Sequence, residues 1–177
     1  MELLRNARAD FDLEEFLDRP LLAHVASLSE AGPRASLFWY LWEDSAIWII
    51  VDEGFHTIQE RIRAEPRVAV GFADFDPSKG FLQHVSIRGT ASIERWDDDR
   101  AGRLLHRYYC QLQDYRESSP HLEGEVRGEH PMLFLRIRPE SVFLREQSYR
   151  DEILSKPHPG PEAAERPASR APPGPRP

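Results

Sequence analysis

Three polar side chains on one expected strand have the types and the spacing to bind a ligand. Apolar and polar residues alternate along Phe81–Glu94, so His84, Ser86 and Arg88 fall on one face, opposite a core face. Arginine pairs with phosphate, and histidine can hydrogen-bond the edge of a planar ring or ligate a haem iron. The structural alternatives stay open, because a lone histidine is more often structural and Arg88 can equally form an interstrand or intersubunit salt bridge.

A second candidate group begins an expected helix. Two isoleucines four residues apart share a face, which predicts a helix over about residues 56–65. Its first turn offers unpaired backbone N–H groups near His56 and Thr57, and such groups bind anions such as phosphate. Arg61 on the same helix is a candidate cation, with an ordinary solvated charge as the alternative.

Aromatic residues crowd the stretch Arg34–Glu43. Phe38, Trp39 and Tyr40 are consecutive, so large rings point to both sides of an expected strand. A planar ligand stacks well on such rings, and one or two of them are candidates for ligand contact. For most of them a covered barrel face or a dimer interface is the favoured explanation.

Several kinds of site are absent from the sequence. Cys110 is the only cysteine, which excludes an intrachain disulfide and a multi-cysteine metal site. The histidines show no recognised metal spacing, so no metal site is predicted. No nucleophile elbow, P-loop or Gly-x-Gly-x-x-Gly occurs, and catalytic residues stay unassigned. The net charge of −7 disfavours general nucleic-acid binding, which usually needs a basic face.

Composition divides the chain into a folded part and a tail. One domain is expected over residues 1–155, whereas residues 156–177 hold many prolines, alanines and charges without a large apolar side chain, which predicts a disordered tail. No apolar run approaches the roughly 20 residues needed to cross a bilayer, and no signal-peptide pattern is visible. We therefore expect a cytoplasmic protein without a membrane partner.

The elements that position the candidate residues form a small β-rich domain. Hydrophobic periodicity and turn residues predict about seven mainly antiparallel strands and three helices. The expected strands are Leu21–Leu28, Arg34–Glu43, Ala46–Val51, Arg67–Ala73, Phe81–Glu94, Met132–Arg138 and Val142–Glu146, and the expected helices begin near Asp12, His56 and Asp97. Closing or splitting such a sheet into a barrel removes exposed strand edges.

The order of elements over Pro33–Ile93 resembles the flavin-binding split β-barrel of the pyridoxamine-phosphate-oxidase superfamily. The order is strand, tight turn, strand, short helix, strand, and a long strand that contains Ile87-Arg88-Gly89-Thr90-Ala91. The resemblance implies a mainly β (α+β) fold, an antiparallel split β-barrel with flanking helices.

The family's cofactor motifs are only partly present in this chain. The family has a leading arginine and a trailing lysine on the strand beside the flavin, and these places fall on Ala35 and Tyr40. Its Ser-Arg-Lys before the helix falls on His56-Thr57-Ile58, where only the threonine keeps a hydroxyl. Its flavin-contacting glutamine falls on His84.

The resemblance also implies a function. It indicates an oxidoreductase that binds FMN, or the deazaflavin F420, and transfers hydride to a small-molecule substrate at a cleft of a homodimer. The alternative is a flavin or haem carrier without turnover. In either case the implied cofactor site comprises Phe38, Trp39, Tyr40, His56, Thr57, Arg61, His84 and Arg88.

Overall fold

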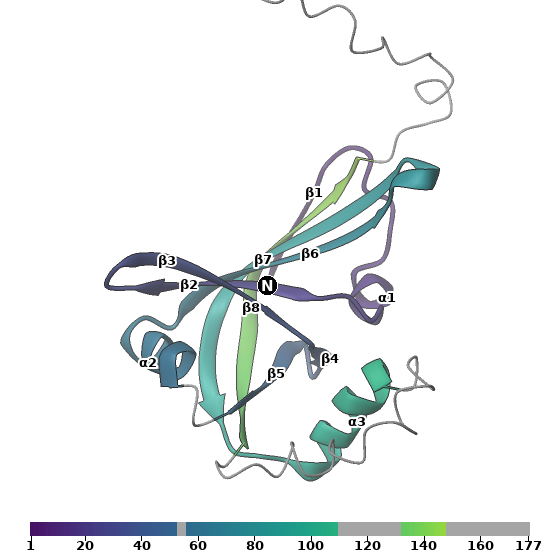
Figure 1. The fold of residues 1–177 in the computed structure, drawn as a ribbon. Coiled ribbons are helices and arrows are strands. Elements are labelled where there is room, and N and C mark those ends of the chain that lie inside the picture. The colour runs from purple at the N-terminus through teal and green to yellow at the C-terminus, as the bar shows by residue number, and fades with distance from the viewer. Residues whose placement is uncertain (53–55, 110–131, 148–177) are drawn as a thin grey trace, which may run out of the picture.

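A single sheet holds all the strands of the computed structural model, which describes residues 1–52, 56–109 and 132–147. The strand order is β3-β2-β6-β7-β8-β5-β4, and β1 pairs with β8 off this path (Figure 1). The strands are β1 Glu2–Arg5, β2 Ala23–Ser29, β3 Gly32–Phe38, β4 Leu41–Glu43, β5 Ala46–Asp52, β6 Arg67–Asp76, β7 Phe81–Glu94 and β8 Met132–Glu146. The helices are α1 Leu13–Leu17, α2 His56–Ala64 and α3 Asp98–Tyr109, with a short 3-10 turn at Pro77–Lys79.

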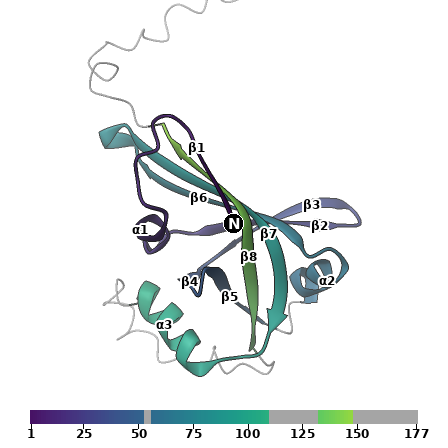
Figure 2. The same ribbon diagram turned by 180° about the vertical axis from the view of Figure 1, so that it is seen from behind.

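The two longest strands, β7 and β8, organise the sheet. They pair antiparallel along their length, while β8 pairs with β5 through one end and with β1 through the other. Figures 1 and 2 show both strands curving, so that the β2–β3 hairpin and the β4–β5 pair stand on different parts of the same bent sheet. The architecture is the predicted α+β split-barrel-like fold, and among the described strands only β1 pairs in parallel.

The core follows the period-two pattern of the strands. Val25, Val70, Ile87 and Val142 are successive cross-strand partners from β2 to β8, and each is at most 1% exposed. Burying one such side chain stabilises the fold by roughly 1.5–3 kcal/mol. This alternation leaves the neighbouring residues of the same strands on the opposite face, which we call the outward face.

A β-bulge explains why the last two predicted strands are one. The register between β7 and β8 shifts so that Arg88 pairs with Ser141 and Gly89 pairs with Pro139. The extra residue, Glu140, is absorbed by the bulge and the ladder continues. The predicted separation into Met132–Arg138 and Val142–Glu146 is therefore wrong, and the strand runs unbroken from Met132 to Glu146.

The second predicted strand, Arg34–Glu43, is in fact two short strands. Trp39 and Tyr40 leave the ladder between β3 and β4. Tyr40 is fully buried, and its hydroxyl lies 2.9 Å from the carbonyl oxygen of Leu17 and 3.0 Å from that of Arg19. These contacts draw the chain inward at the break. Strand β1 was not predicted from the sequence.

The helices cover the openings of the bent sheet. In α1 the Asp12 side chain accepts a hydrogen bond from the Glu15 N–H, as a helix N-cap does. In α2 Ile58 and Ile62 are buried, and the helix packs against β2 and β7. None of the described helices is long and apolar enough to cross a membrane. The predicted tail, residues 156–177, lies outside the described residues.

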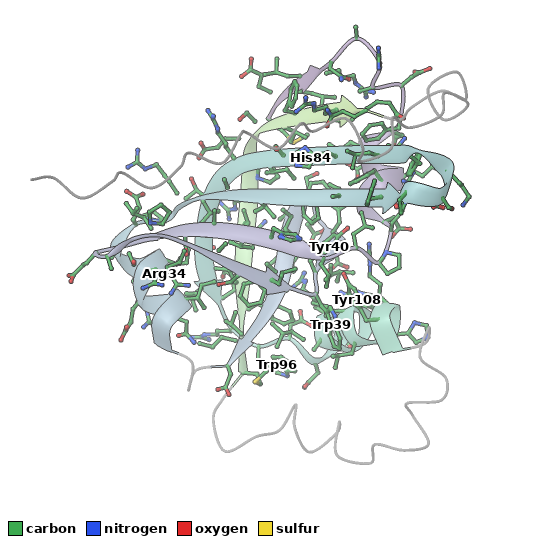
Figure 3. All side chains as sticks on the ribbon, turned by 45° about the horizontal axis from the view of Figure 1, so that its top comes forward. Arg34, Trp39, Tyr40, His84, Trp96 and Tyr108 are labelled. Atoms are coloured by element: carbon green, nitrogen blue, oxygen red, sulfur yellow. The ribbon has the colours of Figure 1, made fainter. Side chains whose placement is uncertain are left out.

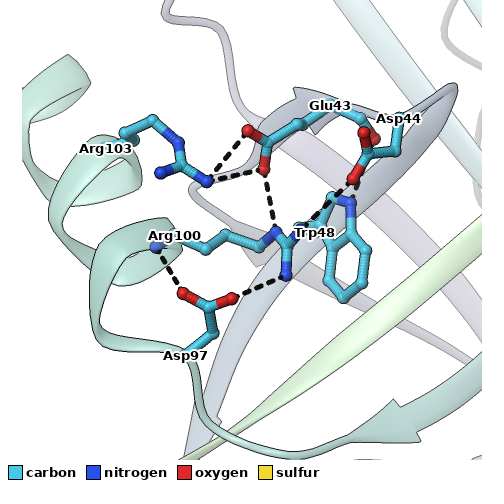
Figure 4. A network of polar contacts seen from close by, with 6 residues as sticks. All are labelled: Glu43, Asp44, Trp48, Asp97, Arg100 and Arg103. Atoms are coloured by element: carbon cyan, nitrogen blue, oxygen red, sulfur yellow. Dashed lines mark hydrogen bonds and ion pairs between the residues drawn. The ribbon is translucent and has the colours of Figure 1, made fainter.

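Helix α3 is fastened to the β4–β5 turn by a charged cluster around Arg100 (Figure 4). The Arg100 guanidinium pairs with Glu43 at 2.9 Å, with Asp44 at 3.2 Å and with Asp97 at 3.3 Å, and it lies 3.8 Å from the centre of the Trp48 ring. Arg103 adds a second ion pair to Glu43. The helix thereby covers the outer side of β5.

Candidate functional site

Helix α2 is joined to the β2–β3 hairpin by a hydrogen bond from an arginine, and a second arginine is close by. Arg61 Nε donates a hydrogen bond of 2.9 Å to Ser27 Oγ. Arg34 is the cross-strand partner of Ser27, so both side chains leave the same face of the β2–β3 hairpin. Figure 3 shows Arg34 close to α2. The arrangement places two cations beside one groove, which both of them line.

Arg34 and Arg61 line a groove between the hairpin and α2, which we call the hairpin groove. Its volume is about 710 Å³, within the range of roughly 300–1,000 Å³ typical of small-molecule sites. Its lining residues are Leu28, Ser29, Glu30, Ala31, Arg34, Glu60, Arg61, Ala64 and Glu65. The groove therefore has the size of a ligand site as well as the cations of an anion site.

The two arginines are available to a ligand. Within residues 1–52, 56–109 and 132–147, no carboxylate forms an ion pair with Arg34 or Arg61. Arg67, just after α2, differs in this respect, because it is bound to Glu65 at 2.7 Å. A phosphate accepts from several such donors at once, and charge-assisted hydrogen bonds of this kind are the strong ones. The cluster can hold a phosphate group.

Helix α2 begins at His56, as predicted, and Thr57 is its second residue. The side chains of both lie outside the described residues, but the backbone N–H groups of the first helical turn have no partner within the helix. Arg61 follows Thr57 by one turn, on the same side of the helix. The start of the predicted helix and the predicted cation Arg61 therefore lie on one side of α2, and this side ends at the hairpin groove.

Sequence reasoning missed Arg34. The leading arginine of the family strand was assigned to Ala35, which is on the outward face and cannot reach the groove. Arg34, one residue earlier, has the required side-chain type and faces Arg61. The signal was present in the sequence as the first residue of the predicted strand. A one-residue shift matters in a strand because it moves a side chain to the other face.

Phe38 and Trp39 border a smaller apolar hollow. It has a volume of about 230 Å³ and is lined by Leu22, Leu37, Phe38, Trp39 and Ile50, none of which is charged. Trp39 is 36% exposed and its ring stacks on Tyr108 of α3, with centroids 5.2 Å apart (Figure 3). Phe38 is on the same face of β3 as Arg34, opposite the outward face. The two residues are four positions apart, which is about 13 Å at 3.3–3.4 Å per residue.

Tyr40 belongs to the core of this chain. It is 0% exposed, its ring packs against Phe72 at 4.7 Å, and burial raises the pKa of its hydroxyl far above the usual value. The Tyr108 hydroxyl lies 3.2 Å from the Tyr40 backbone nitrogen. Tyr40 therefore holds α1 and α3 together, and the hollow beside Trp39 depends on that framework.

His84 and Arg88 are together on the outward face, as the alternation predicts, but on the other side of the sheet from Arg34 and Arg61. Arg88 is exposed between Ala69 and Ser141. His84 is half-buried between Ala73 and Arg145, and this burial together with the Arg145 charge lowers its pKa. Within one chain the predicted site residues form two groups rather than one cleft.

The outward face is unusually apolar. One row of cross-strand partners crosses it from β3 to β1: Leu37, His24, Gly71, Ser86, Phe143 and Leu4. Leu37 is 56% exposed, Leu4 48% and Phe143 37%. Small residues flank the row, since Ala26, Ala69 and Ala73 are exposed on the same strands. A row of exposed apolar side chains of this kind is typical of a protein interface.

The chain is similar to known proteins in sequence and in structure. Residues 11–146 match the sequence family described as pyridoxamine 5'-phosphate oxidase. No curated protein matches the chain. Among solved structures, a conserved hypothetical protein from Mycobacterium tuberculosis aligns with a TM-score of 0.58 at 19% identity, covering 87% of this chain and 94% of that one.

Two further structures have the same fold. The haem storage protein HutZ from Vibrio cholerae aligns with a TM-score of 0.54 at 12% identity, covering 77% of this chain and 94% of that one. An FAD-binding protein from Mesorhizobium loti aligns with a TM-score of 0.50 at 18% identity, covering 73% and 88% respectively. At these low sequence identities, the similarity shows a shared fold and nothing further.

Proposed function

The chain belongs to the pyridoxamine 5'-phosphate oxidase family, and we propose that it is a flavin-binding oxidoreductase subunit that uses FMN or a related flavin to transfer hydride to a small molecule. The observation that carries this proposal is the cluster of Arg34, Ser27 and Arg61 on the hairpin groove. Both cations lack a carboxylate partner among the described residues, and an oppositely charged ligand group would complete the cluster.

The residues fit a flavin phosphate. Arg34 and Arg61 supply guanidinium donors on the groove, and the buried Ser27 hydroxyl holds Arg61 in place by accepting its hydrogen bond. This set replaces the serine and basic pair that the family carries before the helix. The departure at His56-Thr57-Ile58 therefore does not remove the means to hold a phosphate.

The residues also fit a planar ring. Phe38 is on the same face of β3 as Arg34, about 13 Å away, a separation that a ribityl chain with its phosphate ester can bridge. The hollow at Phe38 and Trp39 is lined only by apolar side chains, which favours an aromatic ring over water. Tyr40 acts indirectly, by fixing the chain next to Trp39.

In the proposed reaction, this chain's own residues bind and orient the flavin. A bound flavin supplies the hydride chemistry. Arg34 and Arg61 hold the phosphate end, so that the opposite end is positioned at the hollow. The apolar lining at Phe38 and Trp39 limits access of water to the reacting edge. No described residue is assigned a proton-transfer role.

We further propose that two copies pair through the outward face. Leu37 and Phe143 are exposed in a row of apolar and small residues, and pairing would bury them. His84 and Arg88 are on this face, so in such a dimer they would lie at the interface between the two copies, whereas the hairpin groove stays on the far side of each sheet.

The test is titration of flavin-free protein with FMN, followed by tryptophan fluorescence. Arg34→Ala and Arg61→Ala should each weaken binding by roughly 1.5–3 kcal/mol, or about ten- to a hundredfold, the worth of a charge-assisted hydrogen bond. Arg8→Ala, at an exposed arginine outside the groove, is the matched control and should bind as the wild type. Equal FMN affinity in all four proteins would refute the assignment of this site.

A haem-binding carrier is the second candidate. A Cβ at Gly71 would lie 3.8 Å from His84 Nε2 and 4.0 Å from His24 Cβ, so two histidines flank one open glycine position on the outward face. Histidine nitrogen is an axial ligand of haem iron. Haemin binding that His84→Ala abolishes, without any binding of FMN, would replace the flavin proposal with this one.

A further inference from the structure

The apolar row on the outward face has the same character at its two ends. Leu37 is exposed at the β3 end, and Phe143 and Leu4 are exposed at the β8 and β1 end. Between them the small residues Gly71 and Ser86 form the middle of the row. Such a row matches a second copy of itself after half a turn, because apolar ends meet apolar ends and small residues meet small residues. An isologous contact requires this self-complementarity.

The symmetry of such a contact decides which residues meet at its centre. When two faces pack by a twofold operation, the axis runs within the plane of the contact. An axis through the midpoint of the row covers both apolar ends in each copy. The midpoint is between Gly71 and Ser86, which are cross-strand partners. A side chain at this point therefore meets its own copy, whichever direction the axis takes in that plane.

His84 reaches this midpoint from β7. Its Nε2 atom lies 3.8 Å from a Cβ built on Gly71, so the imidazole extends from β7 towards β6. His24, the cross-strand partner of Gly71, is on the other side, with its own Cβ 4.0 Å from the same point. Two imidazoles thus flank Gly71, and symmetric pairing brings two from each copy to the centre of the contact.

The charges around His84 on this face are positive. Its neighbours are Arg145 on β8, Gly71 and Ala73 on β6, His24 on β2, and Ser86 followed by Arg88 on β7 itself. Within the described part of the chain, no ion pair includes Arg88 or Arg145. The carboxylates of Glu2 and Glu140 are at the levels of Arg88 and Thr90, four and six residues along β7 from His84.

One chain alone already disfavours a charge on His84. Partial burial and the Arg145 charge lower the pKa of this imidazole. Covering the face with a second copy removes more water and adds the second copy's cations. A protonated imidazole at the centre of the contact would then be a buried charge among like charges, which is strongly unfavourable.

We propose that the contact between two outward faces is a pH switch, in which neutral His84 and His24 permit pairing and their protonation in mild acid separates the copies. The inference rests on the pairing of two copies proposed above. Histidine is the side chain whose charge changes between about pH 5 and pH 8. The separated chains expose these imidazoles to water and bind protons more readily, so acid shifts the equilibrium towards single chains.

The experiment measures the mass of the protein by light scattering over a range of concentrations at about pH 7.5 and about pH 5.5, with circular dichroism at both. Each imidazole kept neutral by pairing contributes up to about tenfold at one pH unit below its ordinary pKa of about 6.5. We therefore expect the dissociation constant of the wild-type dimer to rise about tenfold or more in acid, while the circular dichroism stays native.

Two variants at the centre separate charge from shape. His84→Gln is neutral at both pH values and should stay dimeric in acid, whereas His84→Lys is charged at both and should be a single chain even at about pH 7.5. His106→Gln, at an exposed histidine of α3, is the control and should respond as the wild type does.

The possible results are distinct. A wild type that is equally dimeric at both pH values, a His84→Gln variant that dissociates as the wild type does, or a loss of native circular dichroism in acid would each refute the switch. A wild type that is a single chain at both pH values would refute the pairing and the switch with it. FMN does not enter this measurement, so the flavin proposal stands or falls separately.

Discussion

The carbonyl oxygen of Arg138 occupies the space that a side chain at Gly89 would need, because a Cβ built on Gly89 lies 2.2 Å from that oxygen. The two residues face each other at the bulge where β7 and β8 change register. The backbones approach this closely only because residue 89 has no side chain.

Gly89→Ala should therefore destabilise the protein. The strands must separate at the bulge, and overpacking of this kind costs roughly 1–3 kcal/mol. Urea unfolding followed by circular dichroism measures the change. Gly102→Ala is the matched control: no atom lies within 4 Å of its added Cβ, and it is in helix α3, so it should gain roughly 0.5–1 kcal/mol. Equal stability of both variants would contradict the bulge geometry.

Arg100→Ala should release α3 from the β4–β5 turn. The Arg100 side chain is 15% exposed, and its loss leaves Asp97 without its cation and Glu43 with Arg103 alone. We expect a loss of roughly 1.5–3 kcal/mol in the free energy of unfolding, the worth of hydrogen bonds to charged groups. Arg95→Ala, at an exposed arginine, is the control and should change stability by less than about 0.5 kcal/mol.

The effect of Arg100→Ala should depend on pH. Burial alone would raise the pKa of Glu43, but hydrogen bonds from Arg103 and Arg100 outweigh this effect and lower the pKa below 4.5. The pKa of Asp97 is lowered below 3.8 by a backbone hydrogen bond from Arg100 and by the Arg100 charge. Carboxylates with lowered pKa stabilise the fold above their unfolded pKa and lose this contribution as pH falls through the folded value. The difference between wild type and variant should shrink below about pH 4. A difference that is constant down to about pH 2 would show that the ion pairs contribute nothing.

His84 should destabilise the protein in mild acid. Partial burial and the Arg145 charge lower its pKa below 6.5, so between the folded and unfolded values the unfolded chain binds more protons and stability rises with pH. The free energy of unfolding, measured in urea at about pH 7.5 and about pH 5.5, should fall less in His84→Asn than in the wild type. His106→Asn, at an exposed histidine of α3, should fall as the wild type does.

Phe143→Asp should convert the proposed dimer into a monomer. The side chain is 37% exposed in the apolar row of the outward face, and a charge there would be buried without a partner on pairing. Light scattering at micromolar concentration reports the mass. Leu3→Asp is the control, because Leu3 is 42% exposed on the opposite face of β1. A wild-type monomer would contradict the pairing itself.

Local patterns predicted most elements of the fold. The strand Phe81–Glu94 and the cap at Asp12 were predicted to the residue, because alternation and capping depend on near neighbours in sequence. The break at Trp39–Tyr40 was not, since Tyr40 is fixed by carbonyl oxygens of Leu17 and Arg19 about twenty residues earlier. Contacts over such separations leave no local signal.

The candidate site was predictable in part for the same reason. Arg61 was identified because a helix and its start can be read from spacing, and it does line the groove. His84 and Arg88 were correctly placed on one shared face of β7. The sequence did not show that α2 lies on the other side of the sheet, because the curvature of β7 sets that relation. Arg34 required the strand register, which the pairing of Arg34 with Ser27 supplies.

The absorption spectrum of the protein after incubation with excess FMN and desalting tests the central proposal most directly. We predict that flavin absorbance stays with the protein at about one flavin per chain in the wild type and is lost in the double variant Arg34→Ala/Arg61→Ala, whose circular dichroism stays native. Flavin-free wild-type protein after this treatment, at the same FMN concentration, would contradict the account.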